Sequence, residues 1–336
     1  MRFLRSCLVG LIGLQYAVGV AGCRASVEPR NPSYFLHAAM GVKVEVRIDE
    51  RDPQKAREAA IAAFARIDAL DALWSDWKPD SEVSRFNQSV VDGPIEVSAE
   101  TGAALAIAME VAYATEGRFD PTIAPLVALW RQSRAARALP SQAAVDAARR
   151  RVNYRQLECN GVSALIKLEP SLAIDLGGIG KGLAAAEAVA ILATKGCPRC
   201  LVAVAGDLAA GEAPEGCDSW KVDIAWPDGT TEEIALLRQS ASTSGDAEQF
   251  VAIDGVKYAH IIDPTTGLGA TRTQQVTVIG ARTSSEELAV ASITDPHSFI
   301  ANGGRVDAFA TALAISGDHP IQLPTGFRVI RETARK

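Results

Sequence analysis

The chain has 336 residues, of which 48% are hydrophobic, and this is enough material for one large domain or two small ones with a sizeable core. Its formal net charge is −6, which excludes a nucleic acid as the main partner because such proteins carry a strong positive charge. Nothing in the composition indicates extensive disorder.

The N-terminus has the layout of a secretory signal, because two arginines precede an apolar run at residues 7–20. The run ends in the sequence VAGC at residues 20–23, which resembles a bacterial lipobox, where the signal is cut before the cysteine. We therefore expect a signal peptide over residues 1–22 and a lipidated tether over residues 23–37. An ordinary signal peptide is the alternative. The lipobox predicts an exported bacterial protein, anchored in a membrane through Cys23 and facing the periplasm.

Hydrophobic periodicity and turn residues divide the rest of the chain into helices and strands. Residues 42–49 alternate between apolar and charged side chains, which predicts a strand with one wet face. Pro53 opens a long helical pattern, and the sequence PDG at residues 227–229 predicts a hairpin turn. The expected elements are, in chain order, a strand at 42–49, a helix at 53–73, a binding loop at 74–87, a helix at 98–115, an irregular path at 119–126, a solvated helix at 131–151, a buried strand at 171–175, a helix at 183–194, strands at 201–204, 220–226 and 233–237, a strand pair around 254–255, a strand at 275–279 and a helix at 306–315.

No internal repeat and no low-complexity linker interrupts this pattern. We therefore predict a single α+β domain over residues 38–336 rather than two domains.

Four glycines and one lysine crowd into residues 175–182, which have the sequence DLGGIGKG and are called the glycine stretch below. They lie between a predicted strand and a predicted helix, where backbone N–H groups and a helix N-terminus converge on an anion. Lys181 adds a positive charge. A Walker A motif needs Ser or Thr at position 182, and a GxGxxG motif needs glycine at position 183, so neither pattern fits. The residues alone leave an anion site and a tight turn as alternatives.

Four cysteines follow the lipobox. Export would place them in an oxidising compartment, so we expect structural disulfides among Cys159, Cys197, Cys200 and Cys217, with the pairing left open. Cys197 and Cys200 form a CxxC, but it follows a helix and opens a strand, whereas a thioredoxin-like pair lies at a helix N-terminus. A zinc site is disfavoured because no histidine lies near these cysteines in the sequence.

Several polar residues have more than one explanation when taken alone. Asp307 and Thr311 are four residues apart, so a helix places a carboxylate and a hydroxyl on one face, where both suit Mg²⁺. A polar stripe on a solvated helix is the ordinary alternative. For His260 the alternative is simple packing, and aspartates such as Asp207 and Asp246 usually cap their own turns.

Four segments of the chain, taken together and in their order along the sequence, resemble the signature segments of the ApbE family. The members of this family are bacterial FAD:protein FMN transferases. The matching segments are the glycine stretch, TSGD at 243–246, HIIDP at 260–264 with Gly267, and DAFATAL at 307–313. The upstream segments MG at 40–41, KPDS at 78–81 continuing to Asn87, and FDPT at 119–122 look like the family's flavin-facing segments. The resemblance covers residue 38 to the end. It implies an ApbE-like (T-fold-like) α+β domain with a largely antiparallel sheet flanked by helices, and it agrees with the lipobox because many members are lipoproteins.

The resemblance also implies a reaction. FAD, as a substrate, and Mg²⁺ bind, the hydroxyl of a threonine or serine on an acceptor protein attacks the phosphorus of the FMN half, and AMP leaves. Residues matching Asp307, Thr311 and the backbone carbonyl of Gly180 hold the family's metal. His260 would help to deprotonate the hydroxyl or would orient the phosphate. Asp263 would orient the His260 side chain or continue the turn. A pyrophosphate needs cations and N–H donors around its oxygens, which Lys181 and the glycine stretch would supply.

The resemblance assigns further residues to FAD. The implied catalytic residues are His260, Lys181 and Asp263. The residues expected to contact FAD are Met40, Gly41, Trp77, Lys78, Phe119, Asp120, Thr122, Gly178, Lys181, Asp207, Asp246 and His260. The family usually has alanine at the position of Gly180, glycine at that of Ala205 and tyrosine at that of Ala247, and these departures bear on acceptor choice and rate rather than on the reaction class.

Three functions are open from the sequence. The first is the transferase, acting on an exported or membrane redox protein that carries a Thr/Ser flavinylation site. The second is a metal-dependent FAD pyrophosphatase, in which water replaces the protein hydroxyl and FMN and AMP are released. The third is a non-enzymatic lipoprotein that binds FAD, which the presence of Asp307, Thr311 and Gly180 disfavours, because a storage site gains little from a metal at the scissile bond.

Overall fold

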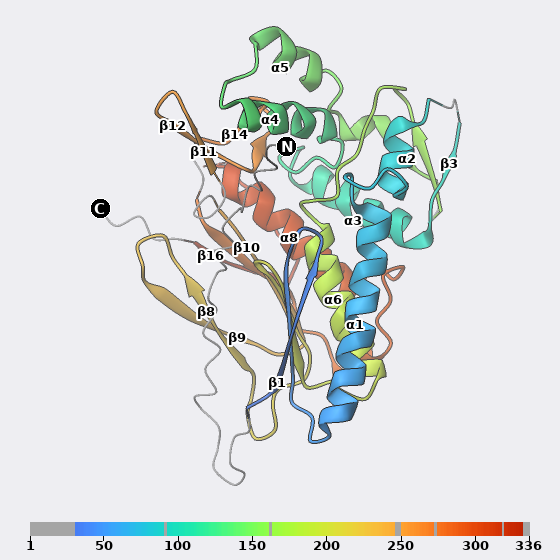
Figure 1. Cartoon of the computed structure of the whole chain (residues 1–336), viewed down its shortest axis with the longest axis vertical. Coiled ribbons are helices and arrows are strands. Elements are labelled where there is room, and N and C mark those ends of the chain that lie inside the picture. Colours follow the sequence, from blue (N-terminus) through green and yellow to red (C-terminus); the bar gives the residue numbers. More distant parts are fainter. Residues whose placement is uncertain are drawn as a thin grey trace, which may run out of the picture.

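A seven-stranded sheet forms the centre of the molecule (Figure 1), and each strand runs antiparallel to its neighbours. In the computed structural model, which describes residues 31–90, 93–160, 163–245, 250–271, 274–317 and 319–331, the strand order is β1-β2-β6-β7-β10-β15-β16. The strands are β1 (Ser33–Ala39), β2 (Val42–Ile48), β6 (Cys200–Val204), β7 (Asp207–Ala210), β10 (Gln239–Ser244), β15 (Val276–Ile279) and β16 (Arg328–Arg331). The mixture of helices and antiparallel sheet confirms the predicted α+β class.

The first hairpin of the sheet corrects the predicted tether. The signal peptide, Cys23 and the first part of the tether lie outside the described residues. Residues 33–37, however, belong to β1, which pairs with β2 along its whole length. Met40 and Gly41 join the two strands with φ angles of 53° and 71°. Two-residue hairpin turns require this left-handed conformation, so the domain begins with a tight hairpin and not with an extended linker.

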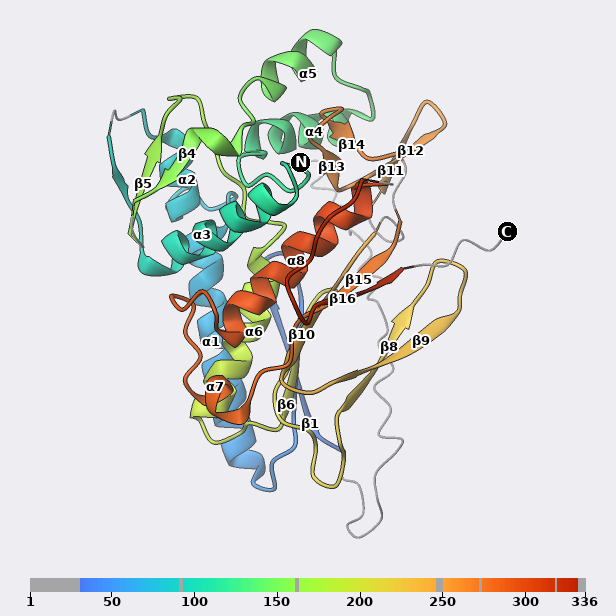
Figure 2. The same ribbon diagram turned by 180° about the vertical axis from the view of Figure 1, so that it is seen from behind.

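Helices cover one face of the sheet (Figures 1 and 2). The helices α1 (Pro53–Trp74), α6 (Gly180–Thr194) and α8 (Phe299–Ile315) pack on the sheet, and α3 (Ala99–Ala114) packs on α8. α6 and α8 approach closely, because a Cβ atom on Gly182 would lie only 2.2 Å from the carbonyl oxygen of Gly303. Glycine is therefore needed where these helices meet, and their contact brings the start of α6 beside α8. No helix within the described ranges combines the length and the hydropathy needed to cross a membrane.

A long hairpin covers the opposite face of the sheet. It consists of β8 (Trp220–Ala225) and β9 (Thr231–Leu236), joined by the turn predicted at residues 227–229. Trp220 and Val222 of the hairpin pack with Leu201 and Leu208 of the sheet in a second buried cluster. The sheet is thus buried between helices and a hairpin, which explains why β6 and β7 are buried along their whole length.

A smaller unit, which we call the cap, lies above the end of the sheet in Figure 1. Its elements are α4 (Ala124–Ala136), α5 (Gln142–Arg149), β11 (Phe250–Ile253), β12 (Val256–Ala259), β13 (Ile262–Asp263) and β14 (Leu268–Gly269). Leu126, Trp130, Ala148, Tyr258 and Ile262 form a hydrophobic cluster of its own, separate from the main core. Two segments more than 100 residues apart in sequence therefore fold together in the cap.

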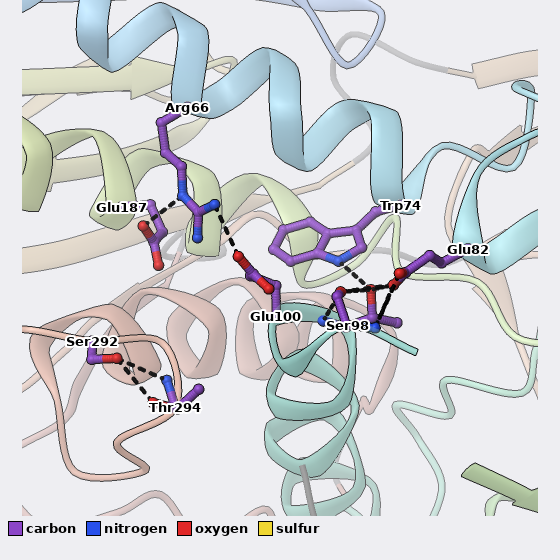
Figure 3. Close-up of polar contacts among 9 residues, drawn as sticks. Arg66, Trp74, Glu82, Ser98, Glu100, Glu187, Ser292 and Thr294 are labelled. Carbon is purple, nitrogen blue, oxygen red and sulfur yellow. Dashed lines mark hydrogen bonds and ion pairs between the residues drawn. The ribbon is translucent and has the colours of Figure 1, made fainter. Parts of the chain in front are cut away.

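Polar contacts join the helices of the main core to one another (Figure 3). The Arg66 guanidinium on α1 bonds to Glu187 of α6 at 3.0 Å and to Glu100 of α3 at 3.2 Å. Glu82 accepts a hydrogen bond from the Ser98 hydroxyl at 2.7 Å, which braces the start of α3. The remaining short elements are α2 (Glu82–Gln88), β3 (Ile95–Glu96), the 3₁₀ turn Tyr154–Gln156, β4 (Leu157–Cys159), β5 (Ala164–Lys167) and α7 (Ser285–Ala289).

Three predicted helix and loop assignments need correction. The predicted loop at 74–87 ends in α2, because the Ser81 hydroxyl accepts a hydrogen bond from the Ser84 N–H at 3.0 Å and caps that helix. α4 begins at Ala124, inside the segment predicted to be irregular, since proline is tolerated in a first helical turn. The predicted single helix at 131–151 is divided between α4 and α5, because Arg137 has a left-handed φ of 52° and ends the first of them.

The predicted strand before the glycine stretch is also wrong. Residues 171–175 join no sheet. The Ile174 N–H donates to the Asn87 side-chain oxygen at 2.7 Å, and the Asp175 N–H donates to the Pro121 carbonyl at 2.8 Å. Loop partners therefore satisfy the backbone that a neighbouring strand would otherwise satisfy.

The predicted pairings among the four late cysteines are wrong as well, because Cys159, Cys197 and Cys200 are free thiols, whereas Cys217 is disulfide-bonded but to none of these three. The Cys200 thiol donates toward the Pro198 carbonyl at 3.6 Å and is fully buried. Burial raises the pKa of this thiol far above its usual range, so it behaves as a packed core residue.

Candidate active site

The glycine stretch leads directly into α6, which begins at Gly180, three residues earlier than predicted. The residue before it, Ile179, offers no side-chain cap for the first N–H groups of the helix. One of them, the Gly182 N–H, donates instead to Oδ2 of Asp307 on α8 at 3.0 Å. A carboxylate at this position is favoured by the helix dipole, so the predicted helical Asp307 and the predicted anion-binding turn meet at one point.

Lys181 is surrounded by oxygen atoms. Its Nζ lies 3.0 Å from Oδ2 of Asp207, 3.3 Å from Oδ2 of Asp307 and 3.3 Å from the carbonyl oxygen of Gly177. The side chains of Asp207 and Asp307 are 4% and 2% exposed, so both charges are taken out of water. One ammonium group thus holds together two buried carboxylates from different parts of the fold.

The electrostatics of this cluster favour a cation. Burial, and then the negative charge of Asp207, raise the pKa of Asp307 to about 7, although Lys181 acts in the opposite direction. Burial disfavours the charged form of Lys181, but the two carboxylates outweigh burial and raise the pKa of its ammonium group. With both aspartates ionised the cluster carries one net negative charge, which further positive charge would neutralise.

Thr311 and Gly178 close the same site. Asp307 and Thr311 both lie on α8, as predicted, and both face the glycine stretch. A Cβ atom on Gly178 would lie 3.5 Å from Oγ1 of Thr311 and 3.1 Å from Cε2 of Phe119. The missing side chain therefore leaves the Thr311 hydroxyl and the Phe119 ring next to the backbone of the loop.

The residues present fit a hard divalent cation such as Mg²⁺. Oδ1 of Asp207 is buried and has no hydrogen-bond partner among the described residues. Oxygen donors from Asp207, Asp307, Thr311 and the Gly180 backbone belong to the class of ligand that Mg²⁺ prefers. No group of three or more His, Cys, Asp or Glu side chains in the described part of the chain forms a metal cluster, so such a site would also need hydroxyl and backbone oxygens. The sequence assigned Asp207 to the nucleotide and missed its place beside Asp307.

Two turns border this cluster at the end of the sheet. Met40 and Gly41 form the tip of the first hairpin, and the neighbouring carbonyl of Lys43 accepts a hydrogen bond from the Ala205 N–H at 3.1 Å. Ala205 has a φ of 52° in the turn that precedes Asp207. The left-handed conformation explains why glycine suits this position.

Trp77 and Lys78 lie on the loop between α1 and α2. The Trp77 side chain is 74% exposed, and the Arg131 guanidinium lies 4.1 Å from the centroid of its ring. Lys78 forms an exposed ion pair with Asp71 at 2.7 Å. The indole is thus available for stacking, whereas the lysine is paired with a carboxylate of α1.

Asp120 and Thr122 serve the fold in this structure. Both are buried, and the Asp120 carboxylate accepts hydrogen bonds from the Thr122 hydroxyl at 2.6 Å and from the Tyr154 N–H at 3.1 Å. The Thr122 hydroxyl also accepts a bond from the Asn153 N–H at 2.9 Å. These contacts hold the loop that carries Phe119, so their contribution to a ligand site is indirect.

The predicted catalytic histidine belongs to the cap. His260 is exposed and lies between β12 and β13, and its neighbours Ala259 and Ile261 pack on Ala314 and Ile315 at the end of α8. This end follows Thr311 by one helical turn, so the histidine segment borders the cluster.

Asp263 and Asp246 are the other two acidic residues that the sequence predicts near the site. The Asp263 carboxylate accepts hydrogen bonds from the Thr265 N–H at 2.8 Å and from the Thr265 hydroxyl at 2.7 Å. It continues its own turn, which is one of the two roles expected for it. Asp246 and Ala247 lie outside the described residues.

Comparison with known proteins gives one consistent result. The model of the family described as "ApbE family" matches residues 40–319. The FAD:protein FMN transferase of Klebsiella pneumoniae is 30% identical over 294 residues, covering 83% of this chain and 82% of the relative. The protein of the same name from Escherichia coli K12 is 31% identical over 240 residues, or 68% of each chain.

Solved structures agree in fold. A mutant of the flavin transferase ApbE from Vibrio cholerae superposes with a TM-score of 0.72 at 24% identity, covering 91% of this chain and 98% of that one. The ApbE protein from Thermotoga maritima superposes with a TM-score of 0.71 at 25% identity, covering 86% and 88% of the two chains.

Proposed function

The chain belongs to the ApbE family and is a transferase, and we propose that it moves FMN from FAD to the hydroxyl of a threonine or serine on an acceptor protein, releasing AMP. The observation that carries this proposal is the cluster of Lys181 with the buried carboxylates of Asp207 and Asp307 at the start of α6. A helix N-terminus beside a lysine suits a pyrophosphate, and paired carboxylates suit the metal that neutralises it.

FAD would bind along the edge of this cluster. The glycine stretch lets the phosphates approach the backbone, because Gly178 has no side chain to occupy the space beside Phe119 and Thr311. Lys181 supplies a full positive charge to the phosphate oxygens. The exposed Trp77 ring suits stacking with a planar ring of FAD.

The residues that would hold Mg²⁺ are Asp307, Thr311 and the Gly180 carbonyl, with Asp207 beside them. When bound, the ion would neutralise charge on the pyrophosphate oxygens. The Lys181 ammonium lies 3.0 Å from Asp207 and 3.3 Å from Asp307 and offsets one of their two negative charges, so a divalent ion would find negative charge here.

The chemical step exchanges the phosphoanhydride bond of FAD for a phosphate ester on the acceptor. The acceptor hydroxyl oxygen forms a bond to the phosphorus of the FMN half, and the bond from that phosphorus to the bridging oxygen of the AMP half breaks. His260 would accept the hydroxyl proton, a role for which an imidazole is suited near neutral pH. The leaving AMP carries away the negative charge, which Lys181 would stabilise during departure.

One assay tests the proposal. The purified soluble domain is incubated with FAD, Mg²⁺ and an acceptor domain bearing a Thr/Ser flavinylation site, and both protein-bound flavin fluorescence and free AMP are measured. We expect covalent flavin and AMP in equal amounts. AMP together with free FMN would instead identify a pyrophosphatase, and Asp307→Ala should abolish either activity if the carboxylate holds the metal.

We also propose that the protein is exported and anchored in a membrane through a lipid on Cys23, facing the periplasm. The proposal is supported by the arginines and apolar run before the sequence VAGC at residues 20–23. It would bring the enzyme close to exported or membrane redox proteins that act as acceptors. Incorporation of a labelled fatty acid into the wild type, and its loss in Cys23→Ser, would test the anchor.

A further inference from the structure

The face of Trp77 is occupied by an arginine that the predicted chemistry does not use. Arg131 lies in α4 of the cap, and its guanidinium carbon is 4.1 Å from the centroid of the indole ring. The indole itself is 74% exposed. A guanidinium on one face of an exposed ring leaves the other face open to stacking.

Arg131 is itself held by two carboxylates. Asp76, next to Trp77, receives two hydrogen bonds from the guanidinium, one of them at 3.3 Å. Asp175, the first residue of the glycine stretch, lies 3.9 Å from Nη2 of Arg131. The Asp175 carboxylate also accepts the Gly177 N–H at 2.7 Å, and the Gly177 carbonyl contacts Lys181 at 3.3 Å. One guanidinium therefore connects the indole to the loop that carries the lysine.

The anchoring of Arg131 makes this connection rigid. The preceding residue, Trp130, is buried in the cap core against Tyr258. Trp77 and Asp76 belong to the loop after α1, and Asp175 belongs to the loop before α6. Arg131 thus fixes three segments relative to one another, at the point where the cap meets the main body.

We propose that Arg131 is a positioning residue for FAD, which orients the Trp77 ring for stacking with a ring of the cofactor and aligns it with the glycine stretch that receives the phosphates. This inference rests on the proposed function. A preordered indole loses less conformational freedom when the ligand stacks on it, so the benefit appears in FAD binding rather than in the chemical step. The Arg131 side chain does not touch the reacting atoms in this arrangement.

A double-mutant cycle tests the proposal. Arg131→Ala should raise the KM for FAD about three- to tenfold with little change in kcat, since a cation–π contact and its ordering effect are of this size. In a Trp77→Ala background the same substitution should have no further effect on KM. Arg131→Lys should restore part of the affinity, because lysine keeps the charge but loses the two-pronged contact with Asp76.

Controls separate this role from a structural one. Arg134→Ala, on the exposed side of the same helix, should leave the KM unchanged, and the unfolding temperatures of all variants should be compared. Direct FAD binding, followed by flavin fluorescence without acceptor, gives a readout that does not require transfer. An unchanged KM in Arg131→Ala, or equal effects with and without Trp77, would overturn the proposal. Failure of the wild type to bind FAD or to transfer FMN would instead reject the proposed function.

Discussion

The Gly182 N–H donates to Oδ2 of Asp307 at 3.0 Å and thereby joins the start of α6 to the middle of α8 across 125 positions of the sequence. The same two helices are so close that Gly182 has no room for a methyl group. Packing and chemistry therefore depend on one contact, because the carboxylate that caps α6 is also the one predicted to hold the metal. Variants at this contact test both roles.

Two glycine variants in the first turn of α6 should behave differently. In Gly182→Ala the new Cβ would lie 2.2 Å from the Gly303 carbonyl oxygen and 2.8 Å from Cβ of Asp307, so the helices must move apart. We expect a loss of about 3 kcal/mol in the free energy of unfolding and at least a hundredfold loss of transfer. In Gly180→Ala the Cβ would lie 3.5 Å from Cε3 of Trp74, an ordinary contact, and near-normal stability and activity are expected. Urea unfolding and the flavin transfer assay measure both, and equal behaviour of the two variants would contradict the packing argument.

Stability of the metal-free protein should depend on pH through Asp307. Its pKa rises from 3.8 to about 7 on folding, so the folded state binds the proton more tightly than the unfolded state. As pH rises from about 4 to about 7, the free energy of unfolding should therefore fall, on the order of a few kcal/mol, and then level off. Urea unfolding in the presence of a chelator should show this fall in the wild type and not in Asp307→Asn. Asp80→Asn, at an exposed position, serves as the control, and parallel profiles for the wild type and Asp307→Asn would reject the assignment.

Removal of the His260 imidazole should slow transfer without loss of FAD. We expect His260→Ala to lower kcat about 10²- to 10⁴-fold, the range typical of a general base, while the affinity for FAD changes little. Rapid measurement of flavin attachment at saturating FAD and Mg²⁺ gives the rate. His297→Ala changes an exposed histidine elsewhere and should have no effect. Full activity in His260→Ala would show that another group, or the solvent, takes the proton.

The ion pairs of Arg66 with Glu187 and Glu100 (Figure 3) should contribute to the stability of the fold and not to the rate of transfer. Arg66→Ala would leave Glu187, whose side chain is 8% exposed, without its cationic partner, at a cost of about 2–3 kcal/mol in the free energy of unfolding. Adding Glu187→Gln should recover part of that loss because the buried charge is removed. Lys221→Ala, which breaks a more exposed pair with Glu233, should cost less than about 1 kcal/mol. A transfer rate that fell while stability stayed the same would point to a role in the site.

The sequence was informative where chemistry depends on local pattern. The helix around Asp307 and Thr311 followed from spacing, and the structure places both residues against the glycine stretch. The alternation at residues 42–49 identified β2, and the PDG turn identified the hairpin of β8 and β9. Such features are encoded within a few residues, so one sequence is enough to predict them.

Other features depend on residues that are distant in sequence. The salt bridge of Asp207 to Lys181 requires β7 and α6 to be packed together, and no local motif indicates it. The segment that leads to Asp175 looks like a strand because its apolar residues are buried, but the Asp175 N–H donates to the loop carbonyl of Pro121. Likewise the predicted export favours disulfides at Cys197 and Cys200, but both are free thiols buried in the core. Tertiary packing decides these cases, and pattern alone does not contain it.

The separate core of the cap has a consequence for how the molecule opens. Because Trp130, Tyr258 and their neighbours share no buried cluster with the main core, the cap can lose its packing as a local cooperative unit while the central sheet stays folded. Amide hydrogen exchange should then be faster in α4, α5 and β11–β12 than in β6 or α6.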